Sequence, residues 1–315
     1  MLQQTTFSAV SPRFAPFLDR FPDVGSLAEA TEDDVLAAWS GLGYYARARN
    51  LRRAAIEIVR DHEARIPRDP LVLRHLPGFG SYMSAAVASL AYGARLPAIE
   101  ANVERVVSRL FAIPGDAGSP ALRKAVALRL DGLLPRLRPG DLTAALMDLG
   151  QLICTPRRPA CGACPLGADC AGRATGQPER FPGRRPRPEP VRVSLAAAAA
   201  RRNGRLLLVR RRSSWLDGLW EFPSAEAASP VGARRALARR VAELDLELEG
   251  SSPIGRARHA VVNRRLEITV FPARRSSVGG AGPRADRARW FLPAELENAA
   301  VPTLTRKIAA ALLRG

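Results

Sequence analysis

The sequence predicts a mainly α-helical domain followed by an α+β domain. Across residues 1–175 apolar residues recur at helical spacing and strand-like alternation is nearly absent, whereas short strand-like runs follow residue 191. Between them lies PERFPGRRPRPEP (178–190), a proline- and arginine-rich segment that suits neither a core nor a helix. We therefore expect domains at 1–175 and 191–315, separated by an extended linker at 176–190.

Composition narrows the possible functions. The chain has 315 residues, 47% of them hydrophobic and 25% charged, a balance typical of globular domains. Its net charge of +18 comes from 46 arginines and two lysines, and residues 176–315 hold +14 of it. Arginine suits phosphate groups, so we expect a polyanionic partner, although a GC-rich genome also favours arginine. The first residues lack a basic stretch followed by an apolar one, so no secretory signal is expected.

Capping residues predict the helices of the first domain. Thr31 precedes an acidic first turn, and Ser119-Pro120 precedes leucines and a valine spaced four apart. Asn102–Leu110 is expected to be a helix with one valine-rich stripe. The uncharged run Leu76–Ala94 is long enough to raise the question of a membrane span. Because Pro77, Gly78 and Gly80 open this run, we expect a buried helix after them and no membrane partner.

The second domain has a different pattern. VRVSLAAAAA (191–200), RLLLVR (205–210) and LEITVF (266–271) are expected to be strands, with a turn at Asn203-Gly204. Residues 231–244 and 303–313 are expected to be helices. These features predict an α+β fold.

All four cysteines lie in one short segment, CTPRRPACGACPLGADC, at Cys154, Cys161, Cys164 and Cys170. Thiolates this close together suit a metal ion or a cubane cluster, and the compartment is expected to be reducing. A zinc site more often pairs two C-x-x-C knuckles across a longer gap, and one such pair exists here. The spacing favours a [4Fe–4S] cluster, with zinc as the alternative.

Two further motifs precede the cysteines. The segment LPGFGS consists of Leu76, Pro77, Gly78, Phe79, Gly80 and Ser81. Its glycines permit a tight turn, and the amides of the helix that follows are suited to a DNA phosphate; an ordinary corner between helices is the alternative. Glu100 precedes the helix that starts near Asn102. It is either a helix cap or, if it faces DNA, a carboxylate that stabilises a sugar cation at C1′.

These three motifs, in this order, resemble the helix–hairpin–helix DNA glycosylases that carry an iron–sulfur cluster. WSGLGYYARARNL (39–51), MDLGQLIC (147–154) and FPGRRP (181–186) are similar to the adenine DNA glycosylase (MutY) branch, closely over residues 1–190 and loosely beyond. The resemblance implies a monofunctional base-excision repair enzyme. Such an enzyme flips adenine mispaired with 8-oxoguanine, or with guanine, out of duplex DNA and removes it. It also implies a [4Fe–4S] cofactor and a monomeric bacterial protein of the cytoplasm, associated with the nucleoid.

The residues themselves support the monofunctional assignment. Relatives with lyase activity place a Schiff-base lysine two residues after the second hairpin glycine, where this chain has Tyr82. Lys124 is the only lysine in the first 175 residues. By resemblance, Glu100 stabilises the oxocarbenium ion, while Tyr82 and Asn102 shape the pocket. The resemblance also assigns DNA contacts or base contacts to Gln3, Gln4, Tyr44, Asp148, Arg157 and Arg158.

The chain departs from the adenine glycosylases at its start and near Glu100. In those enzymes a proton-donating glutamate lies two residues before the Met of the motif containing MLQQT, and this sequence starts at that Met. We therefore expect the printed chain to be impaired or inactive, since a positioned acid typically contributes ~10²–10⁴ in rate. Their catalytic aspartate aligns with Glu100, whose side chain is one methylene longer, and their next residue, glycine, aligns with Ala101.

Residues 191–315 resemble the Nudix-like lesion-recognition domain of the same enzymes through RLLLVRRRSSWLDGLWEFP (205–223). RRALARRVAEL lacks the acidic cluster of a working Nudix helix, so pyrophosphate hydrolysis is not expected. The family's lesion-reading segment aligns with Val261, Val262 and Asn263 and differs from them, whereas the preceding Arg258 and His259 are kept. We retain His259 and Asn263 as lesion-recognition candidates. Two alternatives stay open: a non-catalytic mismatch-binding protein, and a glycosylase for another mispair such as thymine opposite guanine.

Overall fold

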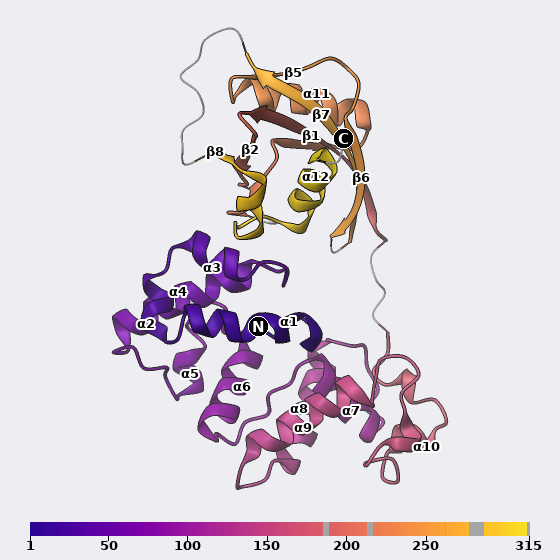
Figure 1. The fold of residues 1–315 in the computed structure, drawn as a ribbon. Helices are drawn as coiled ribbons and strands as arrows, with labels where there is room; N and C mark the ends of the chain where they lie inside the picture. Colours follow the sequence, from indigo (N-terminus) through magenta and orange to yellow (C-terminus); the bar gives the residue numbers. More distant parts are fainter. Residues whose placement is uncertain (185–188, 213–216, 262, 277–286, 314–315) are drawn as a thin grey trace. The chain divides into compact units, whose positions relative to one another are not determined.

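The structure of this protein is a computed structural model that describes residues 1–184, 189–212, 217–261, 263–276 and 287–313 (Figure 1). The chain forms two compact units, one of residues 1–59 together with 188–315 and the other of residues 60–187. The predicted mainly α-helical region and the α+β region after it are both confirmed. The domain limits expected at residues 175 and 191 stay a prediction.

Four helices begin the first unit, and side-chain caps mark the start of α2 and α3. They are α1 (Phe7–Arg20), α2 (Val24–Glu29), α3 (Glu32–Ala38) and α4 (Ala46–Asp61). Thr31 caps α3 by accepting a hydrogen bond from the amide of Asp34, as the sequence predicts. The acidic first turn of α3 then places negative charge at the positive end of the helix dipole.

Residues 60–187 are also helical. Their elements are α5 (Pro70–Leu73), α6 (Ser81–Tyr92), α7 (Ala101–Leu110), α8 (Pro120–Leu133), α9 (Pro139–Leu152), α10 (Ala171–Ala174) and 3₁₀ turns at Cys161–Ala163 and Pro178–Arg180. Valines and leucines of α7, α8 and α9 form their core. The α6 helix begins only after Gly80, so the uncharged run is a turn followed by a short helix. None of the described helices has the length and hydropathy needed to cross a membrane.

The α7 helix is buried on more sides than its sequence predicts. The valines of the expected stripe are buried, but so are Glu104, Arg105 and Arg109. Glu104 accepts hydrogen bonds from the amide of Gly118 at 2.7 Å and from Arg123 at 3.3 Å. Burial of these charges is tolerated because each has hydrogen-bond partners. Arg105 and Arg109 both have partners in the cysteine segment, while Arg105 also bonds Asn102 and Arg109 also bonds Phe181.

The α+β region is a mixed sheet with a helix on each face (Figure 1). Its elements are β1 (Val191–Arg202), β2 (Arg205–Arg210), β3 (Trp220–Glu221), β4 (Ser224–Ala227), α11 (Pro230–Ala242), β5 (Leu246–Leu248), β6 (Gly255–Val261), β7 (Arg264–Arg275), β8 (Ala288–Phe291), a 3₁₀ turn at Pro293–Glu297 and α12 (Thr303–Leu313). The strand order is β3-β2-β1-β7-β5, with β4 also paired to β1, β6 to β7 and β8 to β2. Strands β1 and β7 run parallel, and the other pairs are antiparallel.

Alternate residues of one strand enter different cores because side chains alternate across a sheet. Ala196 and Ala198 of β1 pack in one core with Leu237 of α11. Leu195 packs in the other core with Ile308 of α12. This alternation fixes which side chains of β6 and β7 face each helix.

The first part of the expected linker packs against unit 60–187. The amide of Gly183 donates to the carbonyl of Gly115 at 2.8 Å, and the amide of Ala117 donates to the carbonyl of Gly183 at 2.9 Å. Arg109 Nε donates to the carbonyl of Phe181 at 2.9 Å. This part is therefore not an extended spacer, since backbone bonds and a buried arginine hold it. Residues 185–188 of the expected linker lie outside the described residues.

Candidate functional site

Glu100 is the N-cap of α7 and accepts three hydrogen bonds. Its Oε1 accepts from the backbone amides of Asn102 at 2.8 Å and Val103 at 3.0 Å. Its Oε2 accepts from the side-chain amide of Asn102 at 3.2 Å. Glu100 therefore caps α7, as the first of the two sequence-based interpretations predicts. The same hydrogen bonds hold its half-buried carboxylate in one orientation. A fixed carboxylate is also what stabilisation of a sugar cation requires.

Tyr82 lies in the first turn of α6, half-buried and close enough to sense the charge of Glu100. Burial raises the pKa of the Tyr82 hydroxyl, and the negative charge of Glu100 raises it further. The phenol is therefore neutral at physiological pH and offers a hydrogen-bond donor instead of an amine nucleophile. Lys124 is exposed on α8. Of the predicted catalytic residues, the structure brings Tyr82, Glu100 and Asn102 together.

A buried arginine connects this group to the first cysteine. Arg105 donates to Asn102 Oδ1 at 2.7 Å, to the carbonyl of Gly150 at 2.7 Å and to the carbonyl of Cys154 at 2.8 Å. Asn102 in turn donates to Glu100. The chain of contacts therefore runs from a candidate catalytic carboxylate to the cysteine segment. Sequence reasoning missed Arg105, because an arginine in a helix is ordinarily assigned to the surface.

The hairpin Leu76–Ser81 has the shape of a tight turn before a helix. Leu76 is buried and its carbonyl accepts from the amide of Phe79 at 3.1 Å. Gly78 has a φ of +82°, a conformation that favours glycine. Gly80 is the N-cap of α6 without a side-chain cap, and a Cβ placed there would meet no atom within 4 Å. The backbone is thus open to an approaching anion, which keeps the phosphate-binding hypothesis available.

The four cysteines lie around one another and form no disulfide. Burial raises the pKa of the Cys161 thiol, and the neighbouring thiols of Cys154, Cys170 and Cys164 raise it further. The Cys161 thiol therefore stays protonated unless a bound cation favours its thiolate form. Among the described residues, no group of three His, Cys, Asp or Glu side chains is arranged around a single ion.

Arg109 of α7 forms hydrogen bonds with the cysteine segment. It donates to the Sγ of Cys154 at 3.3 Å and to the carbonyl of Thr155 at 2.7 Å. The thiol of Cys170 donates to the carbonyl of Arg109 at 3.4 Å. Arg157 and Arg158, the candidate DNA contacts of this segment, are exposed.

In the other unit, Arg47 joins two of the segments predicted to probe DNA. It donates to the carbonyl of Met1 at 2.7 Å, to the carbonyl of Gln3 and to the Thr5 hydroxyl at 2.7 Å. Its guanidinium also lies 5.7 Å from the ring centroid of Tyr44, which is 53% exposed. The structure therefore brings the Gln3 segment to the Tyr44 loop through a half-buried arginine that sequence reasoning did not single out. Gln4 beside them is exposed.

The lesion-recognition candidates surround the turn between β6 and β7. His259 is half-buried on the side of the sheet that faces α12, and Asn263 is exposed, with its carbonyl accepting from the amide of Val191 at 2.7 Å. Val261 is half-buried and packs on the core of that side. Val262 lies outside the described residues. The roles of these residues stay predictions.

Among the described residues, no hydrogen bond or ion pair joins Asp148 to Tyr82, Glu100 or Asn102. Asp148 is exposed on α9, two residues before Gly150, whose backbone approaches Asn102. Residues two apart on a helix lie roughly 200° apart around its axis. Its assignment to the flipped adenine therefore stays a prediction without a supporting contact.

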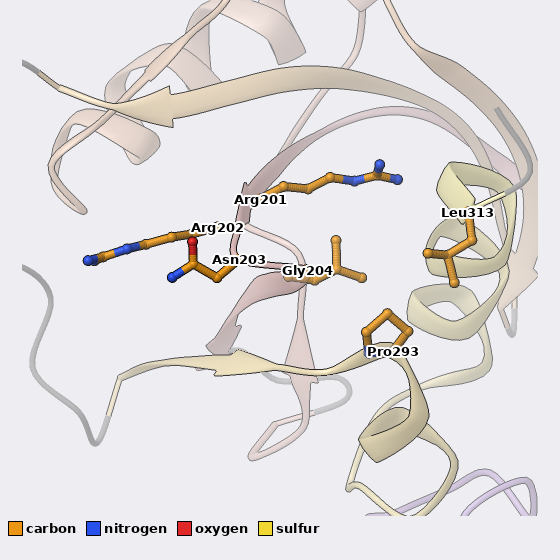
Figure 2. Close-up of a pocket in the computed structure, with 7 residues that line it drawn as sticks. Arg201, Arg202, Asn203, Gly204, Pro293 and Leu313 are labelled. Carbon is orange, nitrogen blue, oxygen red and sulfur yellow. The ribbon is translucent and has the colours of Figure 1, made fainter.

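A pocket of about 320 Å³ lies at the turn between β1 and β2, away from every predicted site residue (Figure 2). Its lining includes Arg201, Arg202, Pro293 and Leu313. Figure 2 shows the side chains of Arg201 and Arg202 pointing in different directions. Arg201 donates to the carbonyl of Leu312, so this guanidinium is already engaged by α12.

Three family models match the chain. They are described as a HhH-GPD superfamily base excision DNA repair protein over residues 1–129, the iron-sulfur binding domain of endonuclease III over 154–170, and a NUDIX domain over 196–311. The second match covers all four cysteines, so they belong to an iron–sulfur-binding domain. The order of the three matches is the order predicted from the sequence.

Curated relatives give a consistent result. The adenine DNA glycosylase of Mycobacterium tuberculosis is 39% identical over 233 residues, which cover 73% of this chain and 72% of the relative. That of Mycolicibacterium smegmatis is 40% identical over 185 residues, covering 59% of this chain and 62% of the relative. That of Homo sapiens is 29% identical over 358 residues, covering 98% of this chain and 66% of the relative. The chain thus spans about two thirds of the length of these relatives, and it belongs to the adenine DNA glycosylase family of base-excision repair proteins.

Proposed function

We propose that this protein is a monofunctional DNA glycosylase that removes adenine mispaired with 8-oxoguanine or guanine. The observation that carries the proposal is the group of Tyr82, Glu100 and Asn102, in a chain of the adenine DNA glycosylase family. Tyr82 stands where lyase relatives have an amine, and Glu100 supplies a fixed carboxylate. The reaction class is hydrolysis of the bond between adenine and the C1′ of its sugar.

Each residue of the group has a separate role in adenine removal. Glu100 stabilises positive charge at C1′ as the bond to adenine breaks, while Asn102 holds one carboxylate oxygen and Arg105 holds Asn102. Tyr82 lines the pocket beside Glu100. By resemblance, the proton that adenine takes up comes from a glutamate two residues before Met1. A positioned acid typically contributes ~10²–10⁴ in rate, so adenine release should be slow from any polypeptide that lacks this glutamate.

The cysteine segment supports a [4Fe–4S] cluster bound by Cys154, Cys161, Cys164 and Cys170. The donor set fits, because four thiols without disulfides lie around one another and Arg109 donates to the Cys154 sulfur. When bound, such a cluster supplies a rigid, charged anchor for the segment. The chain's own contribution is to present Arg157 and Arg158 to DNA. The proposed partner is duplex DNA, which the protein binds as a monomer.

The test is single-turnover adenine release from a duplex with one adenine opposite 8-oxoguanine. It compares the 315-residue polypeptide with one that carries the upstream glutamate, both with the cluster intact, and Glu100→Gln serves as the inactive control. We expect strand breaks to appear only after alkaline treatment of the abasic product, and adenine release to be at least ~10²-fold faster with the upstream glutamate. Strand cleavage without alkali would contradict the monofunctional assignment.

A panel of mispairs separates the alternatives. Release of thymine opposite guanine, but not of adenine, would mean that the altered Val261–Asn263 segment and Glu100 serve another substrate. Tight mispair binding without base release by the longer polypeptide would mean a protein that finds mispairs without cutting. Equal rates of adenine release opposite 8-oxoguanine and opposite guanine would contradict a preference for 8-oxoguanine. The glycosylase proposal itself would remain supported.

A further inference from the structure

One end of the sheet face that bears α11 is occupied by arginines. In β6, Ala257, His259 and Val261 face the α12 side, because Ala257 and Val261 pack on that core and His259 senses Lys307 of α12. Side chains alternate along a strand, so Arg256 and Arg258 face the opposite side. Both are exposed.

The strand register adds two more arginines to this face. In β7, Arg265 lies opposite Ala260 of β6 and beside Arg192 of β1. Residues paired across neighbouring strands point to the same face. Arg265 and Arg192 are therefore on the face of Arg256 and Arg258, and both are exposed. We name Arg192, Arg256, Arg258 and Arg265 the arginine patch.

The α11 helix leaves this end of the face open. It packs on the opposite end, where Ala196, Ala198 and Phe271 are buried with Leu237. Beyond them the exposed residues of β6 and β7 alternate with residues that enter the α12 side. The patch is thus a solvent-exposed group of arginines next to the β6–β7 turn, on β1, β6 and β7, the strands labelled in Figure 1.

The charges of the patch are only partly compensated, by Glu267. Across the described residues, no ion pair within 4.0 Å involves any of its four arginines. Arg265 and Arg192 are direct neighbours on paired strands, and like charges in that position destabilise a sheet. Among the residues of β6 and β7 that face the same side as the patch, Glu267 is a carboxylate, and it lies opposite Arg258. A net positive, exposed surface with like charges side by side favours an external polyanion.

We propose that the arginine patch binds the phosphates of the duplex DNA backbone without reading bases. The proposal rests on the proposed function, because DNA is the polyanion on which a member of this family acts. Guanidinium groups pair with phosphate oxygens through two donors at once. An exposed array spread over three neighbouring strands suits a regular series of phosphates better than one small anion in a pocket. The α+β region would then hold DNA through its sheet as well as through its lesion-reading turn.

The experiment compares two variants of the full chain that carry the same reduced charge. Arg258→Gln/Arg265→Gln neutralises half of the patch. Arg202→Gln/Arg239→Gln removes two exposed arginines from the opposite end, since Arg202 ends β1 about 33 Å along the strand from Arg192 and Arg239 lies in the last turn of α11. Affinity for an undamaged duplex is measured from about 50 to 200 mM KCl.

We expect the patch variant to bind the duplex more weakly and to lower the salt slope of log K by about 2, one unit for each phosphate that the variant no longer binds. The control variant should keep a slope close to that of the parent. Glu267→Gln gives a test of opposite sign, because removal of the carboxylate should strengthen binding. If the substitutions only disturbed the fold, both the patch variant and Glu267→Gln would bind the duplex more weakly.

Equal slopes for the patch variant and the control would overturn the proposal while the parent's DNA binding stands. Weaker binding by Glu267→Gln would also overturn it. Adenine release is measured separately at saturating enzyme. A parent that binds duplex DNA tightly but releases no base contradicts the proposed function and leaves the patch supported by its salt slope.

Discussion

Arg105 Nε donates to the backbone carbonyl of Cys154 at 2.8 Å, so a side chain of α7 reaches the first cysteine of the iron–sulfur segment. The same guanidinium donates to Asn102 Oδ1 at 2.7 Å, and Asn102 donates to Glu100. Arg105 is 9% exposed. A buried, rigid fork with partners on both sides makes the position of the carboxylate depend on the position of the cysteine segment.

Arg105→Gln should therefore impair cluster retention and adenine release together. A hydrogen bond to a charged donor contributes about 1.5–3 kcal/mol, and this substitution removes several of them at once. The measurements are the visible absorbance of the cluster per polypeptide and the single-turnover rate. Arg136→Gln, at an exposed arginine after α8, is the control and should change neither. An Arg105→Gln protein with a full cluster and a normal rate would contradict the coupling.

Gly150 and Gly132 form a matched pair for the contact between α7 and α9. A Cβ at Gly150 would lie 2.6 Å from the Cβ of Asn102, whereas a Cβ at Gly132 would meet nothing within 4 Å. Gly150→Ala should force the helices apart, lower the free energy of unfolding by about 1–3 kcal/mol and slow adenine release by displacing Asn102. Gly132→Ala should raise the free energy of unfolding by about 0.4–1 kcal/mol. Denaturant unfolding measures both, and similar losses for the two variants would refute the close approach.

Glu100 can be tested with two substitutions that keep its role as a cap. Glu100→Gln retains an acceptor for the amides of Asn102 and Val103 but removes the charge, so adenine release should fall at least ~10²-fold with little change in stability. Glu100→Asp keeps the charge on a shorter side chain and is a good N-cap. We expect it to be faster than the parent, since the aligned family residue is aspartate. Single-turnover rates check both, and an unchanged rate in Glu100→Gln would remove Glu100 from the mechanism.

Local signals predicted the features that local chemistry determines. Thr31 and Ser119 cap helices as expected because each accepts from an amide three residues ahead. The cysteine spacing likewise identified the iron–sulfur segment, and the β-branched and apolar runs identified the strands. Each of these depends on residues close in sequence.

The buried arginines could not be predicted in the same way. Arg105 and Arg109 have their partners at Cys154 and Thr155, more than forty positions away in sequence, and helical periodicity alone assigns arginine to the surface. Arg47 reaches back to Met1 in the same manner. The packing of residues 178–183 against α7 and the loop after it was also missed, because proline content describes the local chain and does not identify its distant partners.

His259 gives the α+β region a pH dependence of known sign. Burial lowers the pKa of its imidazole below the ordinary value of 6.5, and the positive charge of Lys307 lowers it further. As pH falls through 6.5 the unfolded chain takes up a proton that the folded chain does not yet accept. The folded state therefore loses stability over this range, and the loss is complete below the folded-state pKa.

Replacement of His259 should flatten that dependence. Between about pH 7.5 and pH 5.5 the Tm of His259→Gln should fall less than the Tm of the parent, because the variant has no imidazole to protonate. Lys307→Gln should reduce the fall by a smaller amount, since it removes the lesser of the two causes and leaves burial. His62→Gln, which changes another histidine in the other unit, controls for general acid effects. Parallel Tm curves for the parent and His259→Gln would mean that the imidazole titrates alike in both states.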